Sequence, residues 1–185
     1  MIDTEALRRQ PELTGETVVL KQLDESYFEA SWKALQEPET IRLTGTHTVF
    51  TEEQIRKWLA SRPGLDDRAD YAIVRDEDGV YLGDVVLSGL DEDNRSAAFR
   101  IALTGPDVFG KGYGTEATKL ILDFAFEVVG LHRVSLEVFD FNPRARHVYE
   151  KCGFVREGLQ REALWWDGAW HDVLTMAVLK SDPRP

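Results

Sequence analysis

The sequence predicts a mixed α/β fold whose sheet is mostly antiparallel. Three observations point to it. Short stretches that alternate apolar and polar residues are separated by brief polar turns in the first hundred residues, which is typical of antiparallel strands. A long amphipathic helix then lies between two strands, as in a crossover that joins parallel strands. The chain ends with two strands around a short turn.

The first half supplies four expected strands. Residues 17–23 alternate apolar and polar side chains, as a half-buried strand does. Three more strands are expected over 70–75, 80–88 and 96–103. The turns between these three are short and polar, so they form an antiparallel meander.

Three helices are expected before residue 130. Two short amphipathic helices cover 25–36 and 51–62, and the second begins at Thr51. The clearest helix covers 113–129, and Gly130 fits its C-terminal cap. Its apolar face consists of Ala117, Leu120, Ile121, Phe124 and Val128.

The last third supplies three more strands and one helix. A strand over 132–139 is followed by a helix over 143–151, for which Asn142 is the N-cap. Strands over 153–162 and 170–179 form a final hairpin. The sheet should therefore contain about seven strands, flanked by about four helices.

Composition and charge restrict the function. The chain has 185 residues, of which 43% are hydrophobic and 30% charged, so we expect a single domain over 1–185. The polar residues 1–13 are expected to form a loosely held N-terminal segment. Because 33 Asp and Glu residues outnumber 22 Lys and Arg residues, the net charge is −11. This charge disfavours nucleic-acid binding and suits a cationic substrate.

Cysteine and histidine usage argues against a metal site. Cys152 is the single cysteine, so no internal disulfide and no multi-cysteine zinc site can form. This usage favours a reducing compartment, here the cytoplasm. The four histidines lack metal-ligand spacing. The apolar runs are too short to span a membrane, and the N-terminal residues do not resemble a signal peptide.

The most informative segment is a glycine-rich loop, residues 110–117 (GKGYGTEA), between a strand and the start of the long helix. Three alternating glycines let a ligand approach the backbone closely. Free N–H groups and the helix dipole would then bind a phosphate or pyrophosphate.

Two nucleotide-binding alternatives share this loop. Residues 105–111 satisfy most of a P-loop pattern, but Gly112 follows where a Ser or Thr hydroxyl should bind magnesium. Residues 112–117 fit a dinucleotide fingerprint, with Glu137 near the position of the ribose partner. That fingerprint opens a parallel doubly wound sheet, whereas this loop follows an antiparallel meander.

The loop resembles the acyl-CoA pyrophosphate loop of the GNAT superfamily of N-acetyltransferases, whose pattern is Gln/Arg-x-x-Gly-x-Gly/Ala. Gly112 and Gly114 match its glycines, and Phe109 departs from the usual Gln or Arg. Residues 142–154 (NPRARHVYEKCGF) resemble the next motif of the family, Asn-x-x-Ala-x-x-x-Tyr-x-x-x-Gly-Phe. Residues 161–172 resemble the branch that contains ribosomal-protein N-terminal (alanine) acetyltransferases.

The resemblance implies a twisted sheet with a splayed parallel pair, formed by 96–103 and 132–139, at its centre. The gap between the pair would admit the pantetheine arm of acetyl-CoA, which is the expected co-substrate. The residues implied in binding it are Ile101, Ala102, Leu103, Gly110, Lys111, Gly112, Tyr113, Gly114, Thr115, Asn142 and Arg146.

The resemblance also implies the catalytic residue. Tyr149 matches the family tyrosine, and its hydroxyl would act as the general acid for the departing CoA thiolate. The carboxylate that relatives carry near 98–101 is replaced here by the run Ala-Phe-Arg-Ile. The general base is therefore open. The candidates are Asp84, Glu137, His47, Asp172 and solvent.

The sequence thus predicts an acetyl-CoA-dependent N-acetyltransferase that acts by direct attack in a ternary complex. The acceptor is a primary amine, either a peptide N-terminus, a polyamine or another small amine. The alternatives are a non-catalytic acyl-CoA sensor on the same fold and a nucleotide-dependent enzyme. A homodimer is implied by the resemblance alone.

Overall fold

The computed structural model describes residues 2–185, which form one sheet of eight strands in the order β1-β2-β3-β4-β5-β6-β8-β7. β5 and β6 are parallel, and all other neighbours in the sheet are antiparallel. The strands are β1 (Leu13–Thr14), β2 (Val18–Gln22), β3 (Ala69–Arg75), β4 (Tyr81–Asp91), β5 (Ser96–Leu103), β6 (Arg133–Phe139), β7 (Val155–Trp166) and β8 (Ala169–Leu179). The predicted mixed α/β fold is confirmed, and the two-residue β1 is the strand that the sequence did not predict.

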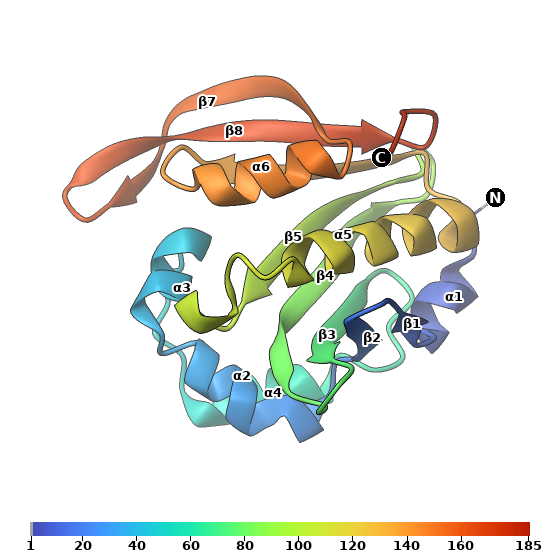
Figure 1. Ribbon diagram of the computed structural model, residues 1–185, viewed down its shortest axis with the longest axis horizontal. Coiled ribbons are helices and arrows are strands. Elements are labelled where there is room, and N and C mark those ends of the chain that lie inside the picture. The colour runs from blue at the N-terminus through green and yellow to red at the C-terminus, as the bar shows by residue number, and fades with distance from the viewer. Residues whose placement is uncertain (1) are drawn as a thin grey trace.

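The helices include all four that the sequence predicted and two more. Figure 1 shows α6 beside the β7–β8 ribbon, and α3 below the tip of that ribbon. The α-helices are α1 (Thr4–Arg9), α2 (Phe28–Ala34), α3 (Pro38–Thr44), α4 (Glu52–Ala60), α5 (Tyr113–Asp123) and α6 (Pro143–Lys151). The shorter helical segments are η1 (Glu25–Tyr27), η2 (Pro106–Val108) and η3 (Phe124–Val129).

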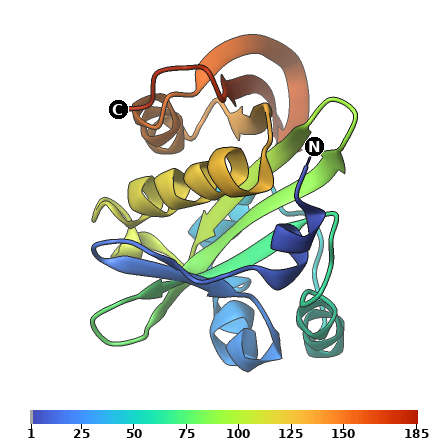
Figure 2. The same cartoon turned by 90° about the vertical axis from the view of Figure 1, so that its right-hand side faces the viewer.

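Helices cover both faces of the sheet (Figure 2). α5 and η3 lie on one face, where Ile121, Phe124 and Phe126 enter the main core. α2 and α4 lie on the other face, where Phe28 and Leu59 form a second cluster with residues of β3. The capping box of α4, in which Thr51 and Gln54 bond each other's backbone N–H, fixes the start of that helix.

The N-terminal residues pack more closely than the composition of 1–13 suggests. Residues 4–9 form α1, in which Ala6 and Leu7 are buried in the main core. Ala6 and Leu7 alone are too few to give a periodic signal, and the composition of residues 1–13 is otherwise polar, so the sequence did not predict this helix. Met1 lies outside the described residues.

The long predicted helix over 113–129 is present, but its last part is a π-helix over Phe124–Val129. The wider turn buries Phe124, Ala125, Phe126 and Val129 together. Val128, which the regular 3.6-residue pattern placed on the apolar face, is instead exposed. Gly130 ends the helix in the left-handed conformation, as predicted (φ +85°).

The parallel pair separates halfway along its length, which confirms the predicted splay. Ser96, Ala97 and Ala98 of β5 pair with Arg133, Val134 and Ser135 of β6, and the pairing stops there. β5 continues to pair with β4, and β6 with β8, so both strands stay extended while they part. Among residues 2–185, no helix combines the length and the apolar character that a membrane crossing needs.

Candidate active site

A cavity of about 870 Å³ opens where β5 and β6 separate. Its walls include residues 98–103 of β5 and 135–139 of β6, together with parts of α3, the glycine loop and α6. Parted parallel strands leave backbone groups that no longer pair with each other. The cavity can therefore offer both backbone hydrogen bonds and side chains to an occupant.

The cavity reaches both faces of the sheet. Phe99 and Leu136 are buried on the face that carries α5 and α6. Because side chains alternate along a strand, Arg100, Ser135 and Glu137 project to the opposite face, and all three line the cavity. Two reactants could thus approach the gap from opposite sides.

The glycine loop forms the wall at the N-terminus of α5. Gly110 and Gly112 have φ angles of +73° and +87°, which disfavour any residue with a Cβ atom. A Cβ atom at either position would meet no heavy atom within 4 Å, so the space beside the loop is open. The backbone N–H groups in the first turn of α5 also have no carbonyl oxygen of a preceding turn to bond. This arrangement fits an anion such as a pyrophosphate.

The N-terminus of α5 is tied to the N-terminal part of the sheet. Glu116 accepts hydrogen bonds from the backbone N–H of Thr17 (2.9 Å) and from the Thr17 hydroxyl. Burial tends to raise the pKa of Glu116, but these hydrogen bonds outweigh it and lower the pKa. The anchor holds the glycine loop at a fixed place beside the cavity.

The cationic residues near the loop separate into two groups. Arg144, Lys111 and Lys151 line the cavity. Arg146 lies outside the lining, and its guanidinium is 3.7 Å from the carboxylate of Glu150. Helical spacing alone does not find this difference, because Arg144 lies one turn before the cavity residue Val148 and Arg146 lies one turn before the cavity residue Tyr149.

The other residues expected at the cofactor site do line the cavity. They are Ile101, Ala102, Leu103, Gly110, Lys111, Gly112, Tyr113, Gly114, Thr115 and Asn142. Asn142 caps α6, since its Oδ1 accepts a hydrogen bond from the Ala145 N–H (3.1 Å). Its amide nitrogen is left for another contact.

Tyr149 stands between the cavity and the core. The residue is 7% exposed, and its ring meets Phe99 and Phe154 edge-on at 5.8 Å. Burial raises the pKa of the Tyr149 hydroxyl, so the phenol is protonated at neutral pH. Tyr149 also lines the cavity, on the side of α6. A protonated, desolvated hydroxyl there can donate a proton or a hydrogen bond.

Cys152 lies behind this site and does not enter it. The thiol is buried and contacts the carbonyl oxygen of Thr115 at 3.7 Å, which links α6 to α5. Burial raises the pKa of the Cys152 thiol to about 11. A thiol so rarely ionised is a poor nucleophile, so its place is structural.

The four side chains considered as general bases lie in different places. Glu137 lines the cavity and accepts a hydrogen bond from Gln160 Nε2 (2.9 Å). Asp84 lies outside the lining and pairs with Arg100 at 2.7 Å. The His47 ring lies 5.0 Å from the Trp166 ring and is tilted against it, and Asp172 accepts a hydrogen bond from the Glu162 N–H. Glu137 is therefore the only one of the four in the cavity lining.

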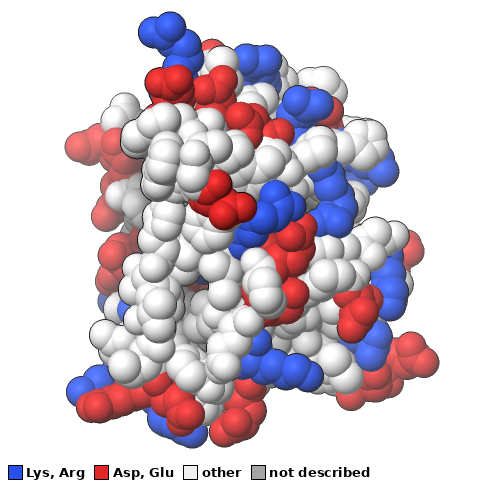
Figure 3. Space-filling model, turned by 90° about the vertical axis from the view of Figure 1, so that its left-hand side faces the viewer, with Lys and Arg blue, Asp and Glu red and all other residues white. Residues whose placement is uncertain are grey.

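An ion pair between Asp84 and Arg100 lies on the face of the sheet opposite α5. Burial raises the pKa of Asp84, and the adjacent Arg100 guanidinium counteracts that rise. Arg100 lines the same cavity as Glu137, and its ion pair with Asp84 offsets its charge there. Figure 3, which views the side carrying α3 and the ribbon tip, shows Lys and Arg atoms next to Asp and Glu atoms, beside a broad band of uncharged atoms. The net charge of the chain is thus not gathered into one acidic patch on this side.

Helix α3 was not predicted, yet it forms a wall of the cavity through Thr40, Leu43 and Thr44. The Thr40 hydroxyl donates to the carbonyl oxygen of Leu103 (3.1 Å) and so covers the end of β5. The Glu37 side chain caps α3 through the Thr40 N–H (2.7 Å). The signal in the sequence was Glu37 followed by Pro38, an N-cap before proline at the first helical position.

Within residues 2–185, no group of three or more His, Cys, Asp and Glu side chains is placed to hold a metal ion.

Known proteins resemble this chain in sequence and in fold. The spermidine N(1)-acetyltransferase of Vibrio cholerae is 37% identical over 109 residues, which cover 59% of this chain and 62% of that protein. The Bacillus subtilis protein named "Putative ribosomal N-acetyltransferase YdaF" is 28% identical over 166 residues, which cover 80% of this chain and 90% of that protein.

A crystal structure of the V. cholerae spermidine N-acetyltransferase, in complex with CoA and spermine, shares the fold. Its TM-score is 0.83 at 24% identity, and the match covers 90% of this chain and 98% of the other. The family described as "Acetyltransferase (GNAT) domain" matches residues 17–155. The chain therefore belongs to the GNAT acetyltransferase family.

Proposed function

We propose that this protein is an N-acetyltransferase that transfers the acetyl group of acetyl-CoA to a primary amine. One observation carries the proposal. The cavity between β5 and β6 has a glycine loop that suits an anion and a protonated Tyr149 on one face, and the carboxylate of Glu137 on the other. These groups suit acetyl transfer to an amine, because a phosphorylated donor must be held while an ammonium loses a proton.

The donor would lie along the gap, where acetyl-CoA supplies a thioester. The N–H groups of residues 110–115 would hold the pyrophosphate, and the open space beside Gly110 and Gly112 fits its approach. The backbone of Ile101 and Ala102 would bond the pantetheine arm. Asn142 would contribute its amide nitrogen while its oxygen caps α6.

The reaction is a direct attack. The amine nitrogen forms a bond to the thioester carbon, the carbon–sulfur bond breaks, and the electron pair leaves on sulfur. Tyr149 donates its proton, or a hydrogen bond, to that sulfur. Glu137 accepts the proton that the ammonium must lose to become an amine with a free lone pair, and Gln160 holds the carboxylate in place. After the attack, the nitrogen loses a second proton to solvent as the neutral amide forms, and Tyr149 regains a proton from solvent.

The acceptor class is a primary amine, and two candidates lead. The name of the V. cholerae relative supports spermidine. A peptide N-terminus is favoured by the charges on the face of the cavity that carries Glu137, opposite α5. Of its two glutamates, Glu157 is paired with Arg133, so Glu137 is left to match a single ammonium. A polyamine carries several charges and would need further carboxylates near the opening.

Two further properties belong to the proposal. The buried, unpaired Cys152 fits a reducing compartment such as the cytoplasm.

β7 is the last strand of the sheet, and Val155 and Leu159 are exposed along it, which fits a homodimer through this edge. Light scattering of the purified protein tests the dimer, and a monomeric mass at micromolar concentration contradicts it.

The test of function has two steps. Calorimetry first measures CoA binding, with ATP and NAD as controls, and a dissociation constant in the micromolar range is expected. Thiol release is then followed with spermidine, spermine and a peptide that has a free N-terminus. CoA binding without turnover of any amine would favour the acyl-CoA sensor. Nucleotide binding without CoA binding would overturn the proposal.

A further inference from the structure

The side chain before the glycine loop is held against α6 in an unexpected way. Phe109 stands where the acyl-CoA loop pattern has Gln or Arg, so the loop lacks a polar side-chain donor at this position. The guanidinium carbon of Arg144 lies 3.9 Å from the centroid of the Phe109 ring. Both residues line the cavity. A side-chain donor is therefore present beside this position, but it comes from helix α6.

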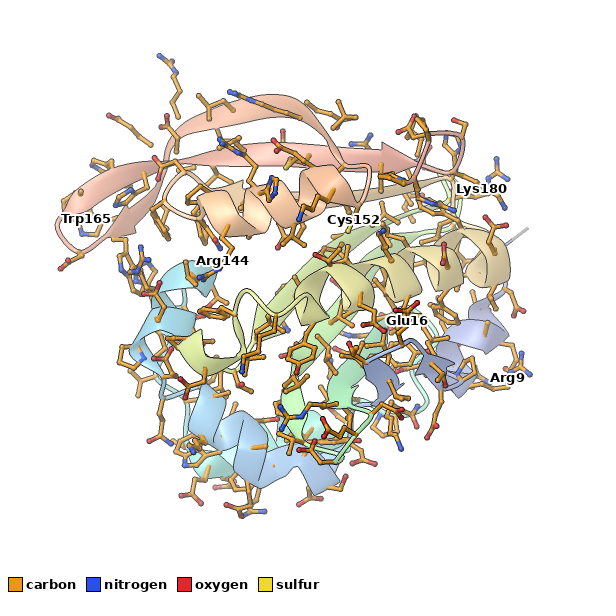
Figure 4. All side chains as sticks on the ribbon, viewed as in Figure 1. Arg9, Glu16, Arg144, Cys152, Trp165 and Lys180 are labelled. Atoms are coloured by element: carbon orange, nitrogen blue, oxygen red, sulfur yellow. The ribbon has the colours of Figure 1, made fainter. Side chains whose placement is uncertain are left out.

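We propose that Arg144, stacked on Phe109, binds the pyrophosphate of CoA in place of the absent loop side chain. The inference rests on the proposed function and assigns one residue of that site. Arg144 lies in the first turn of α6, and Figure 4 labels it below the N-terminal half of that helix, on the side that faces the glycine loop. A guanidinium in this position can reach the same anion as the loop N–H groups.

The stacking also prepares Arg144 for binding. An arginine in water loses rotamer freedom when it binds an anion, which weakens the interaction. A guanidinium that already lies on an aromatic ring has lost part of that freedom and keeps its N–H edge available. The backbone of Phe109 is held at the end of η2, since the Phe109 N–H donates to the Pro106 carbonyl oxygen (3.2 Å).

The charges around Arg144 leave it available. Over residues 2–185, no carboxylate lies within ion-pair distance of its guanidinium. The acidic residue whose charge it influences is Glu39, on α3, which already makes two hydrogen bonds to Arg42 (2.8 and 2.9 Å). Arg146, two residues along, is paired with Glu150 outside the cavity. Arg144 is thus the arginine of α6 that an anion in the cavity can recruit.

The test compares the two arginines of one helix. Arg144→Gln and Arg146→Gln remove the same charge, and calorimetry measures their affinities for CoA and 3′-dephospho-CoA, which share the pyrophosphate. Arg144→Gln should weaken both ligands equally, by about tenfold or more, because a charge-assisted phosphate contact is lost. Arg146→Gln should stay within about twofold of the wild type. Phe109→Leu should fall between the two, and its melting temperature verifies that it folds.

The outcomes separate this inference from the proposed function. If the wild type binds neither ligand, the proposed function fails and the inference fails with it. If the wild type binds CoA and Arg144→Gln binds it equally well, the inference alone is overturned. A loss confined to CoA would assign Arg144 to the 3′-phosphate, and equal losses in both variants would show a general charge effect. Either result contradicts the pyrophosphate assignment.

Discussion

At the scale of single residues, the chemistry depends on keeping the hydroxyl of Tyr149 protonated. Burial raises its pKa, and the edges of Phe99 and Phe154 hold the ring, so the hydroxyl can donate but cannot readily ionise. We predict that Tyr149→Phe lowers kcat by about 100-fold or more, because a general acid is lost, while the dissociation constant for CoA changes little. An assay of thiol release measures kcat, and calorimetry measures the dissociation constant for CoA.

Tyr27→Phe is the matched control for this variant. Tyr27 packs against Tyr81 near α2, away from the cavity lining, so loss of its hydroxyl should leave kcat unchanged. Equal kcat in Tyr149→Phe and the wild type would remove Tyr149 from the chemistry. A parallel loss of CoA affinity would instead assign it to donor binding.

Glu137 gives a prediction with a pH signature. Glu137→Gln keeps the shape of the side chain and removes its capacity to accept a proton. At about pH 7 an alkylamine is mostly protonated, so kcat/KM should fall on the order of 100-fold. The defect should shrink as the pH rises past the pKa of the acceptor, about 8 for a peptide N-terminus and about 10 for an alkylamine, because the amine then loses its proton to solvent. A defect of constant size across this range would show that Glu137 binds the acceptor without moving a proton.

At the scale of elements, the hydrogen bonds from Thr17 to Glu116 connect α5 to the sheet. Glu116→Gln should lower the free energy of unfolding by about 1–2 kcal/mol, since a charged acceptor is lost. The pKa of Glu116 is lowered in the folded state, so its contribution is present above the unfolded pKa of about 4.3. It disappears as the pH falls through the lower folded pKa.

Denaturant titrations at several pH values measure this effect. The difference between wild type and Glu116→Gln should be largest near neutral pH and should close in acid. Glu53→Gln is the control, because its partner Lys57 is exposed on α4 and such a pair contributes little. A difference that persists unchanged into acid would mean that packing, and not the carboxylate, is responsible.

The glycine loop gives the second prediction at this scale. Gly112→Val should weaken CoA binding by about tenfold or more, because the side chain strains a backbone at φ +87° and fills the space beside the loop. Gly64→Val is the matched control, with φ +82° and equally open surroundings outside the cavity lining. Gly64→Val should lower the melting temperature, because its backbone is strained, and should leave CoA affinity intact. Equal CoA affinity in the wild type and Gly112→Val would contradict the role of the loop.

The lengths of the elements also explain which of them could be predicted from the sequence. β2 to β8, α5 and α6 have runs long enough to show a period, and Asn142 and Gly130 mark helix ends by type. α1 and α3 have only six and seven residues, and no adjoining helical turn lengthens them as η1 lengthens α2, so they give little periodic signal. Their packing also depends on distant strands. In the site, glycine and tyrosine spacing was informative. The contact between Arg144 and Phe109 was not, because it joins residues 35 positions apart through tertiary structure.

At the scale of the whole molecule, one core joins the N-terminal residues to the face that carries α5. Leu7 is 1% exposed and belongs to the same buried cluster as Tyr71, Leu122 and Val129. A chain that folds as a single domain should therefore lose stability everywhere when this contact is weakened. Leu7→Ala removes buried methyl groups at a site with little freedom to collapse, so we expect a loss of about 2–5 kcal/mol.

For a chain of this length, that loss should lower Tm by on the order of 10 °C. Circular dichroism and tryptophan fluorescence should report one shared transition, because α1 and the tryptophans of α4 and the β7–β8 ribbon would unfold together. Val49→Ala, at a side chain that is 93% exposed, should leave Tm unchanged. Two separate transitions in Leu7→Ala would contradict a single cooperative domain. An unchanged Tm would mean that residues 4–9 are held loosely in solution, with no share in the core that supports the active site.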